Sequence, residues 1–297
     1  MLCQKVGNCI QRCMGIDATN AIYNVSYEAD KMNNGATQYH ENFKKWLTRF
    51  QTEDLIGCCA QTDTKGDRLL RPADQPNPGS YVHIKERTKD GIIVEGCKVH
   101  ISEASVADEV LVLPTRALRK EDANYAVGFA IPGDWDGLKQ VVTIHNLRNR
   151  EHYKRGFMPG ATDSYMIFEN CFVPWERVFM CREHEFASQL VEKFASYHRQ
   201  SYACKCGMGD VLIGATQTIA EYNGIADAPH VRDKIVEMNH LNETIFCCSL
   251  ACAYEGSQEP SGTYYVNSLL ANITKLHVTR VPYELAKMAH EIAGGAV

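Results

Sequence analysis

The sequence predicts an α+β fold in which a β-rich middle section lies between two helical sections. Residues 1–50 and the chain after about residue 183 carry apolar residues at the three-to-four spacing of amphipathic helices. The region between them has short β-type runs separated by Gly, Pro and Asp. We therefore expect three domains: the end of an N-terminal helical domain over 1–50, a β-domain over 51–180, and an incomplete C-terminal helical bundle over 181–297.

The individual elements follow from the same patterns. NNGAT (residues 33–37) separates two expected N-terminal helices, and Thr37 is a candidate cap for the second helix. Expected strands lie at 81–87, 91–101, 109–115, 125–133 and 166–179, with TKDG (residues 88–91) as a hairpin turn. They predict a small antiparallel barrel or sandwich. Four helix-length segments follow, at 185–203, 207–224, 230–256 and 265–295, and they are too apolar to stand alone.

Composition and charge exclude several function classes. The formal net charge is −5 and no cluster of Lys and Arg is present, so we expect no nucleic-acid partner. No run reaches the length of a membrane span, and the first residues lack the apolar core of a signal peptide. The 13 cysteines are an odd number in a large chain, which favours reduced thiols in the cytoplasm of an anaerobic cell. Most should be buried, including the pairs Cys58-Cys59 and Cys247-Cys248.

Two groups of residues could bind a metal. Cys9 and Cys13 are four apart, which on a helix puts both sulfurs on one face, as a zinc ion or an iron–sulfur cluster requires. Two buried core thiols would show the same spacing. His198 lies near Cys204 and Cys206 in ASYHRQSYACKCG (residues 195–207), where His, Arg, Gln, Ser and Tyr crowd a bundle helix. Burying such polar groups is costly unless they are satisfied, which favours a functional cluster over a plain core.

Two other polar features are less specific. TDTKGDR (residues 62–68) is a Gly-containing loop between a helix and the first expected strand, and its backbone N–H groups could hold a phosphate or the edge of a flavin ring. A capped surface turn would look the same. Asp163 is a carboxylate at the start of a strand, where most such residues form turns.

Seven motifs together carry a resemblance to a known family: NCIQRCMGIDATNA, TDTKGDR, GIIVEGCKVH, FENCFVPWERVF, FASYHRQSYACK, MNHLNET and YELAKMAHEIAGG. Together they resemble the 4-hydroxybutyryl-CoA dehydratases (vinylacetyl-CoA delta-isomerases), within the 4-hydroxyphenylacetate 3-monooxygenase large-subunit family. That family is built like the acyl-CoA dehydrogenases. The resemblance spans essentially the whole chain, which looks like a central fragment, and it implies FAD, a [4Fe–4S] cluster, an acyl-CoA substrate and a homotetramer.

The resemblance also implies roles for individual residues. The family's flavin-binding loop matches Cys59, Ala60, Gln61, Thr62, Asp63, Thr64, Lys65 and Gly66, and Ser102 stands where the family usually has a flavin-facing Thr. Cluster ligands would be Cys9, Cys13, His198 and one Cys of the CKC segment. His198 would also act as a base, Tyr202 matches an active-site tyrosine, and Lys205 lies beside the cluster. Asp163 stands where the family has a catalytic glutamate, so its carboxylate is one methylene shorter.

The choice of the fourth cluster ligand depends on the local helix. Residues turn by about 100° each on a helix. The family has its Cys seven residues after the His, whereas here Cys204 is six after His198 and Cys206 is eight after it. An unbroken helix favours Cys206. The downstream register favours Cys204, and we expect Cys204 to be the ligand, with a local bulge or helix break absorbing the missing residue.

The resemblance predicts radical dehydration of 4-hydroxybutyryl-CoA to crotonyl-CoA, with isomerisation of vinylacetyl-CoA, as in 4-aminobutyrate fermentation. FAD would take and return one electron, and the cluster would act as a Lewis acid. Two alternatives stand beside this hypothesis. One is a FAD-dependent aromatic hydroxylase of the same fold without a cluster, and the other is an inactive truncated copy.

Overall fold

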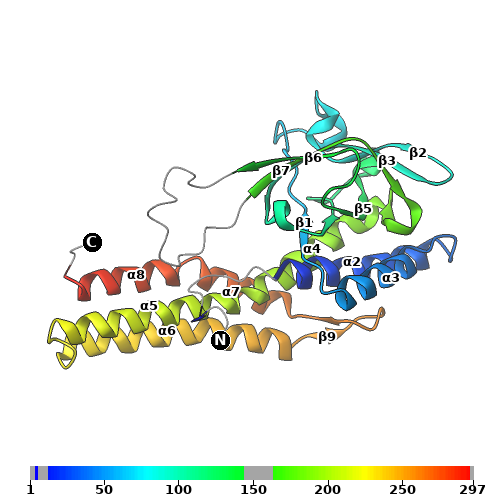
Figure 1. Cartoon of the computed structure of the whole chain (residues 1–297). Helices are drawn as coiled ribbons and strands as arrows, with labels where there is room; N and C mark the ends of the chain where they lie inside the picture. Colours follow the sequence, from blue (N-terminus) through cyan, green and yellow to red (C-terminus); the bar gives the residue numbers. More distant parts are fainter. Residues whose placement is uncertain (1–3, 6–12, 144–162, 295–297) are drawn as a thin grey trace. The chain divides into compact units, whose positions relative to one another are not determined.

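The computed structural model describes residues 4–5, 13–143 and 163–294 and divides the chain into two compact units (Figure 1). The β-unit comprises Met14–Phe194 and Pro260–Thr263. The bundle unit comprises Met1–Cys13, Ala195–Glu259 and Tyr264–Val297. The expected division into three domains at residues 50 and 180 stays a prediction.

Two helices precede the sheets of the β-unit, α2 (Cys13–Met32) and α3 (Tyr39–Thr52). The break at NNGAT is confirmed, but the prediction that Thr37 caps α3 is wrong. The N-cap is Gln38, whose side chain makes no capping bond. Instead, the carboxylate of Asp30 accepts hydrogen bonds from the backbone N–H groups of Tyr39 (3.0 Å) and His40 (2.9 Å). An acid at the end of the preceding helix therefore satisfies the first amides of α3.

Two four-stranded sheets form the rest of the β-unit. Sheet A has the order β1-β4-β5-β8 and sheet B the order β2-β3-β7-β6. The strands are β1 (Gly57–Ala60), β2 (His83–Arg87), β3 (Gly91–Ser102), β4 (Glu109–Val112), β5 (Val127–Pro132), β6 (Leu138–Thr143), β7 (Asp163–Pro174) and β8 (Val178–Cys181). The predicted hairpin between β2 and β3 is confirmed. Strands β1 and β6 were not expected.

The barrel alternative and the purely antiparallel sheet are wrong. Each sheet has two edge strands, β1 and β8 in one and β2 and β6 in the other, so neither closes on itself. β1 pairs with β4 in parallel, whereas the other pairs of both sheets are antiparallel. A parallel neighbour needs a long crossover, and the whole of sheet B's first hairpin lies between β1 and β4 along the chain. The fold class is therefore mixed helix and sheet.

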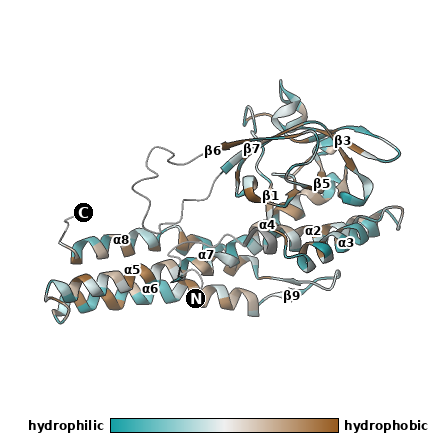
Figure 2. Ribbon diagram, viewed as in Figure 1, coloured by the Kyte–Doolittle hydropathy of each residue, from teal (hydrophilic) through white to brown (hydrophobic). Residues whose placement is uncertain are grey.

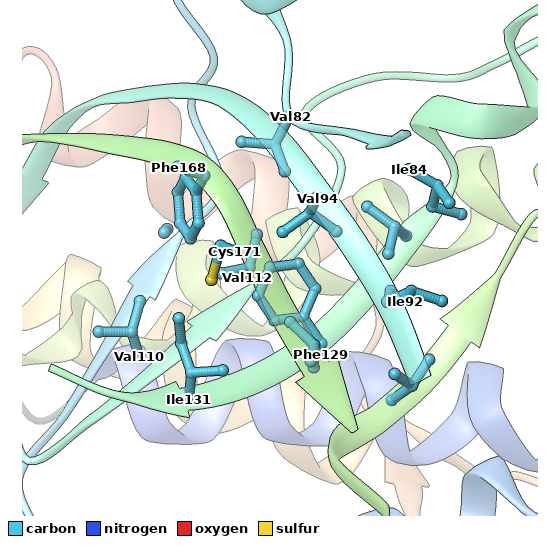
Figure 3. Close-up of a cluster of buried hydrophobic side chains, with 14 of the residues drawn as sticks. Val82, Ile84, Ile92, Val94, Val110, Val112, Phe129, Ile131, Phe168 and Cys171 are labelled. Atoms are coloured by element: carbon cyan, nitrogen blue, oxygen red, sulfur yellow. The ribbon is translucent and has the colours of Figure 1, made fainter. Parts of the chain in front are cut away.

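The core between the sheets explains why sheet A reads as continuous apolar runs. One side of sheet A, with Val110 and Phe129, packs with Val94 and Phe168 of sheet B in one buried cluster (Figure 3). The opposite side packs with Phe43 and other residues of α2 and α3. Both faces of sheet A are thus buried, and hydrophobic stretches recur along its strands (Figure 2).

The bundle unit consists of helices joined by short connections. They are α4 (Ala187–Gln200), of which the part from Ala195 belongs to this unit, α5 (Cys204–Tyr222), α6 (Pro229–Tyr254), α7 (Ser268–Val278) and α8 (Val281–Ile292). A two-stranded hairpin of β9 (Ser257–Gln258) and β10 (Tyr264–Tyr265) links α6 to α7. The segment predicted as one helix over 265–295 is two helices, because Pro282 starts a new one.

The thiols and the helices bear on two sequence predictions. Cys58 and Cys59 are buried, as expected, but the prediction is wrong for the second pair, since Cys247 is exposed and Cys248 is half-buried. None of the described helices combines the length and the apolar character that a membrane span needs.

Candidate active site

The segment after β1, residues 61–66, is referred to below as the β1 loop. Cys59 and Ala60, expected in the flavin-binding segment, are the last residues of β1, and their side chains are buried in the core. Only their backbone atoms can therefore face a ligand. Burial also raises the pKa of the Cys59 thiol well above its usual range, so this thiol stays protonated at neutral pH.

The carbonyl groups at the start of the β1 loop accept hydrogen bonds from other parts of the protein. The Lys98 ammonium donates to the Gln61 carbonyl at 2.8 Å, and the Val99 N–H donates to the Thr62 carbonyl at 2.8 Å. In a trans peptide the C=O and the following N–H point in opposite directions. The N–H groups of Thr62 and Asp63 therefore point away from the atoms that hold the carbonyls, and no described residue accepts a hydrogen bond from either.

The second half of the β1 loop is a tight turn. Lys65 and Gly66 both have positive φ, +69° and +51°. A Cβ at Gly66 would lie 2.3 Å from Oε1 of Gln75, which accepts from the Asp67 N–H at 3.0 Å. A side chain at Gly66 would therefore break this contact, and the position requires glycine. The hydroxyl of Thr64, another expected binding residue, donates to the Ser80 carbonyl at 2.6 Å and so stabilises the turn.

Backbone N–H groups that have no acceptor among the described residues fit the edge of a flavin, whose pyrimidine ring carries carbonyl oxygens and a nitrogen that accept hydrogen bonds. The fit rests on the backbone rather than on charged side chains. It is compatible with the flavin role that the sequence suggested for Gln61, Thr62 and Gly66.

A buried ion pair between Asp63 of the β1 loop and Lys98 of β3 stabilises the loop. Lys98 Nζ lies 2.8 Å from Asp63 Oδ1, and the side chains are 2% and 3% exposed. Burial raises the pKa of Asp63 and lowers the pKa of Lys98, while each charge counteracts the shift of the other. The Lys98 nitrogen has three acceptors, Asp63 Oδ1, the Gln61 carbonyl and the Leu113 carbonyl. Three acceptors match the three protons of an ammonium, so the geometry favours the charged pair.

The predicted catalytic carboxylate contacts the predicted flavin-facing hydroxyl. Ser102 at the end of β3 pairs with Asp163 at the start of β7, and Ser102 Oγ donates to Asp163 Oδ1 at 2.7 Å. Both side chains are half-buried. This hydrogen bond fixes the orientation of the carboxylate.

In the bundle unit, the chain around His198 is not one continuous helix. α4 ends at Gln200, residues Ser201–Ala203 form a turn of 3-10 helix, and α5 begins at Cys204. The backbone stays right-handed helical between His198 and Cys204, so the expected bulge or helix break takes the form of a change of helix type. A 3-10 turn changes the rotation per residue, so the helical phase that favoured Cys206 does not apply.

His198 and Tyr202 come together across this turn. Their rings meet edge to face with centroids 4.9 Å apart. Lys275 of α7 approaches the same tyrosine, with Nζ 3.4 Å from the hydroxyl and 4.7 Å from the ring centroid. An imidazole, a phenol and an ammonium thus form one half-buried cluster that can accept, donate and stabilise a proton.

The two candidate thiols have different surroundings. Cys204 is half-buried at the first turn of α5. Cys206 is 7% exposed, and its Sγ donates to the Asn242 carbonyl at 3.4 Å. Burial raises the pKa of the Cys206 thiol to about 12. Cys206 therefore resembles a structural core thiol, whereas Cys204 has the partial exposure that a ligand needs.

The other expected cluster ligands, Cys9 and Cys13, lie near the start of the chain. Cys9 lies outside the described residues, and so does the side chain of Cys13. Among the residues that the structure does describe, no group of three or more His, Cys, Asp or Glu side chains could hold a metal ion. The donor set itself, three thiolates and one imidazole, suits iron–sulfur chemistry.

Lys205, the remaining predicted catalytic residue, lines an apolar cavity of about 540 Å³ in the bundle unit. Asn242 lies in the same wall and ties α6 to α5 through its amide, which donates to the Cys206 carbonyl at 3.0 Å and to Asp210 Oδ1 at 2.7 Å.

Gly209 on α5 is expected to tolerate no side chain. A Cβ there would lie 2.1 Å from Asn242 Oδ1. Gly209→Ala should therefore lower the free energy of unfolding by about 1–3 kcal/mol through overpacking. At Gly214 on the same helix, a new Cβ would meet no atom of another described element within 4 Å, so Gly214→Ala should raise the free energy of unfolding by about 1 kcal/mol. Thermal unfolding of both variants checks this, and equal stabilities would contradict it.

Sequence reasoning missed two lysines. Lys98 follows Ile92, Val94 and Gly96 at a spacing of two, so it lies on the buried face of β3, where a lysine must be paired. This alternation in the sequence could therefore have predicted a buried, paired lysine. Lys275 sits in an ordinary helical pattern, and only the packing of α7 against the turn at Tyr202 reveals its role.

Comparison with solved structures defines the class of fold. A structure of an oxygen-tolerant archaeal 4-hydroxybutyryl-CoA dehydratase from N. maritimus has a TM-score of 0.93 at 39% identity, and the match covers 99% of this chain and 59% of that one. The oxygenase component of 4-hydroxyphenylacetate 3-monooxygenase, complexed with FAD, shares the fold with a TM-score of 0.77 at 22% identity, covering 96% and 60%.

Sequence comparison then defines the family. Residues 1–180 match the model for the 4-hydroxyphenylacetate 3-hydroxylase N terminal region, and residues 187–297 match that for the C terminal region. The chain therefore belongs to the 4-hydroxyphenylacetate 3-hydroxylase family.

Within this family, the chain is similar to two curated relatives. It is 43% identical to the 4-hydroxybutyryl-CoA dehydratase/vinylacetyl-CoA-Delta-isomerase of Clostridium aminobutyricum, over 99% of this chain and 61% of that protein. It is 35% identical to a 4-hydroxyphenylacetate 3-monooxygenase oxygenase component of Geobacillus sp., over 70% of this chain and 43% of that one. The chain thus spans about three fifths of the first relative's length. The resemblance that the motifs indicated is confirmed.

Proposed function

We propose that this chain belongs to a 4-hydroxybutyryl-CoA dehydratase with vinylacetyl-CoA isomerase activity. The observation that carries the proposal is the 43% identity with the Clostridium aminobutyricum enzyme over 99% of the chain. The cluster of His198, Tyr202 and Lys275 supports it, because the reaction needs groups that exchange protons with carbon atoms next to a thioester.

The dehydration converts 4-hydroxybutyryl-CoA into crotonyl-CoA and water. Protons leave C2 and C3, the hydroxyl group leaves C4, and one proton returns to C4, so there is no net redox change. The isomerisation of vinylacetyl-CoA moves a proton from C2 to C4. Both reactions need a base for C2 and an acid for C4. When bound, FAD would supply reversible one-electron oxidation and the [4Fe–4S] cluster a Lewis acid for the leaving hydroxyl.

The residues that would hold these groups are those named from the sequence. The β1 loop would bind FAD through its outward N–H groups, with Ser102 close to the ring. Cys9, Cys13, His198 and Cys204 would bind the cluster. Cys206 is the less suitable fourth ligand, because it is buried and bonded to Asn242.

Proton transfer is assigned to residues of this chain. His198 would remove the C2 proton, and Tyr202, with Lys275 beside its hydroxyl, would donate or hold a proton nearby. Lys205 would supply positive charge beside the cluster. Asp163, fixed by Ser102, would act as the second carboxylate acid or base.

An acyl-CoA substrate, a homotetrameric dimer of dimers and a cytoplasmic location complete the proposal. Oxygen sensitivity is a separate matter, since the related N. maritimus enzyme is described as oxygen tolerant. An aromatic hydroxylase remains the second candidate, supported by the lower identity to the Geobacillus oxygenase component.

Anaerobic purification tests the proposal directly. We expect a brown protein with FAD, about four iron atoms per chain, and conversion of vinylacetyl-CoA to crotonyl-CoA followed by chromatography. A yellow, iron-free protein that hydroxylates 4-hydroxyphenylacetate with reduced flavin and oxygen would establish the second candidate instead. A colourless protein without either activity would indicate an inactive copy.

A further inference from the structure

We propose that Lys98 is the positioning residue of the flavin site. Its buried ammonium fixes the Gln61 carbonyl of the β1 loop, so that the N–H group of Thr62, in the same peptide, faces the flavin as a strong donor. The identity of the ligand as FAD rests on the proposed function. The role of Lys98 rests on its own contacts.

These contacts are unusually complete for a lysine. Lys98 is 1% exposed, and its ammonium donates to the Gln61 carbonyl, the Leu113 carbonyl and Asp63 Oδ1, each at 2.8 Å. A second donor holds Asp63 in turn, because the Val82 N–H reaches its Oδ1 at 3.0 Å. All three ammonium protons are therefore used within the protein, and Lys98 has none left for a ligand.

Lys98 joins parts of the molecule that are otherwise separate. It lies on β3 of sheet B, while Gln61 and Leu113 directly follow the parallel neighbours β1 and β4 of sheet A. The carboxyl ends of parallel strands lie at the same edge of a sheet, so one cation can reach both. Asp63 and Lys98 also form an isolated backbone bridge between the loop and β3.

The hydrogen bond from Lys98 also sets the direction in which the next backbone N–H group points. The Gln61 carbonyl and the Thr62 N–H belong to one trans peptide, so fixing the carbonyl toward Lys98 directs the N–H to the opposite side. A hydrogen bond from a cation to the carbonyl also polarises that peptide and strengthens its N–H as a donor. The Val99 N–H does the same for the next peptide through the Thr62 carbonyl.

The test compares two cations of the same unit that each contact a buried carboxylate, the buried Lys98 and the half-buried Arg177. Lys98→Met removes the anchor. Arg177→Met is the matched control, because Arg177 also donates to a buried carboxylate, Glu109 Oε2 at 3.1 Å, and to a carbonyl, that of Ala130 at 3.1 Å, but does not contact the β1 loop. The dissociation constant of FAD is measured by flavin fluorescence, and the folded state by thermal unfolding and circular dichroism.

We expect both variants to lower the midpoint of unfolding, while the dissociation constant of FAD rises at least about tenfold with Lys98→Met and less than about threefold with Arg177→Met. The midpoint potential of bound flavin should become more negative only with Lys98→Met, because weaker donors stabilise the reduced ring less. Wild-type affinity in Lys98→Met, or equal loss in both variants, would overturn the proposal.

A double variant guards against simple misfolding. Lys98→Met with Asp63→Leu leaves no buried charge unpaired, so it should fold better than Lys98→Met alone while its FAD affinity stays low. Recovery of wild-type affinity would overturn the role of Lys98. If the wild-type protein binds no FAD, the proposed function fails together with this inference. If it binds FAD and all variants bind equally well, the role of Lys98 alone is overturned.

Discussion

Protein purified anaerobically with Cys204→Ser is expected to lose most of its iron. A three-thiolate, one-imidazole set needs every ligand, and substituting oxygen for sulfur leaves one iron without a soft donor. Iron and acid-labile sulfide per chain, together with the brown absorbance, measure the loss. Circular dichroism should remain that of the wild type, since Cys204 is half-buried at a helix start rather than in the core.

Cys206→Ser is the control for this experiment. The serine hydroxyl can still donate to the Asn242 carbonyl, so the contact that holds Cys206 in the core is kept. The variant should therefore fold and retain the iron content of the wild type. A folded Cys204→Ser protein with full iron, or a folded Cys206→Ser protein without iron, would reverse the assignment of the fourth ligand.

Tyr202→Phe is expected to lower kcat for vinylacetyl-CoA isomerisation by roughly 10²-fold or more, the usual contribution of a positioned proton donor. The phenyl ring would keep its contact with His198, and only the hydroxyl beside Lys275 is lost. Iron and FAD contents should not change. Steady-state rates across pH distinguish the loss of a proton-transfer group, which removes one limb of the profile, from a general loss of binding.

Tyr197→Phe provides the matched control on α4. The Tyr197 hydroxyl donates to the Tyr264 carbonyl at 3.0 Å, so its removal costs stability by about 1 kcal/mol, and Tyr197 is not one of the proposed catalytic residues. Its kcat should stay within about threefold of the wild type. If both tyrosine variants are equally active, Tyr202 has no part in proton transfer.

Hydrophobic periodicity predicted most of the secondary structure, because most elements bury one or two regular faces. It missed β1, where GCCA is only four residues long and lies inside a stretch that otherwise reads as a loop. It also missed the parallel pairing of β1 with β4, which depends on chain segments far apart in the sequence. It also missed the capping of α3 by Asp30, because this acid belongs to the previous helix and not to the residues just before α3.

Part of the candidate site could likewise be predicted from the sequence, and part could not. The sequence motifs predicted that His198, Tyr202 and the β1 loop belong to the site, because each of these motifs is a contiguous stretch of the chain. The hydrogen bond between Ser102 and Asp163 needed the register of β3 against β7, and the role of Lys275 needed the packing of α7. Spacing alone could not choose between Cys204 and Cys206, since the answer depends on a turn of only three residues.

That turn, Ser201–Ala203, also has a consequence for how the family can vary. The backbone stays right-handed helical through this turn, but a 3-10 turn advances by about 120° per residue rather than about 100°, so its length sets the rotation of α5 relative to α4. A residue lost here is offset in part by the larger advance of the 3-10 turn, instead of rotating the rest of the bundle by the full angle of about 100°. Length changes between relatives should therefore collect at this joint, and the neighbouring helices should align without gaps.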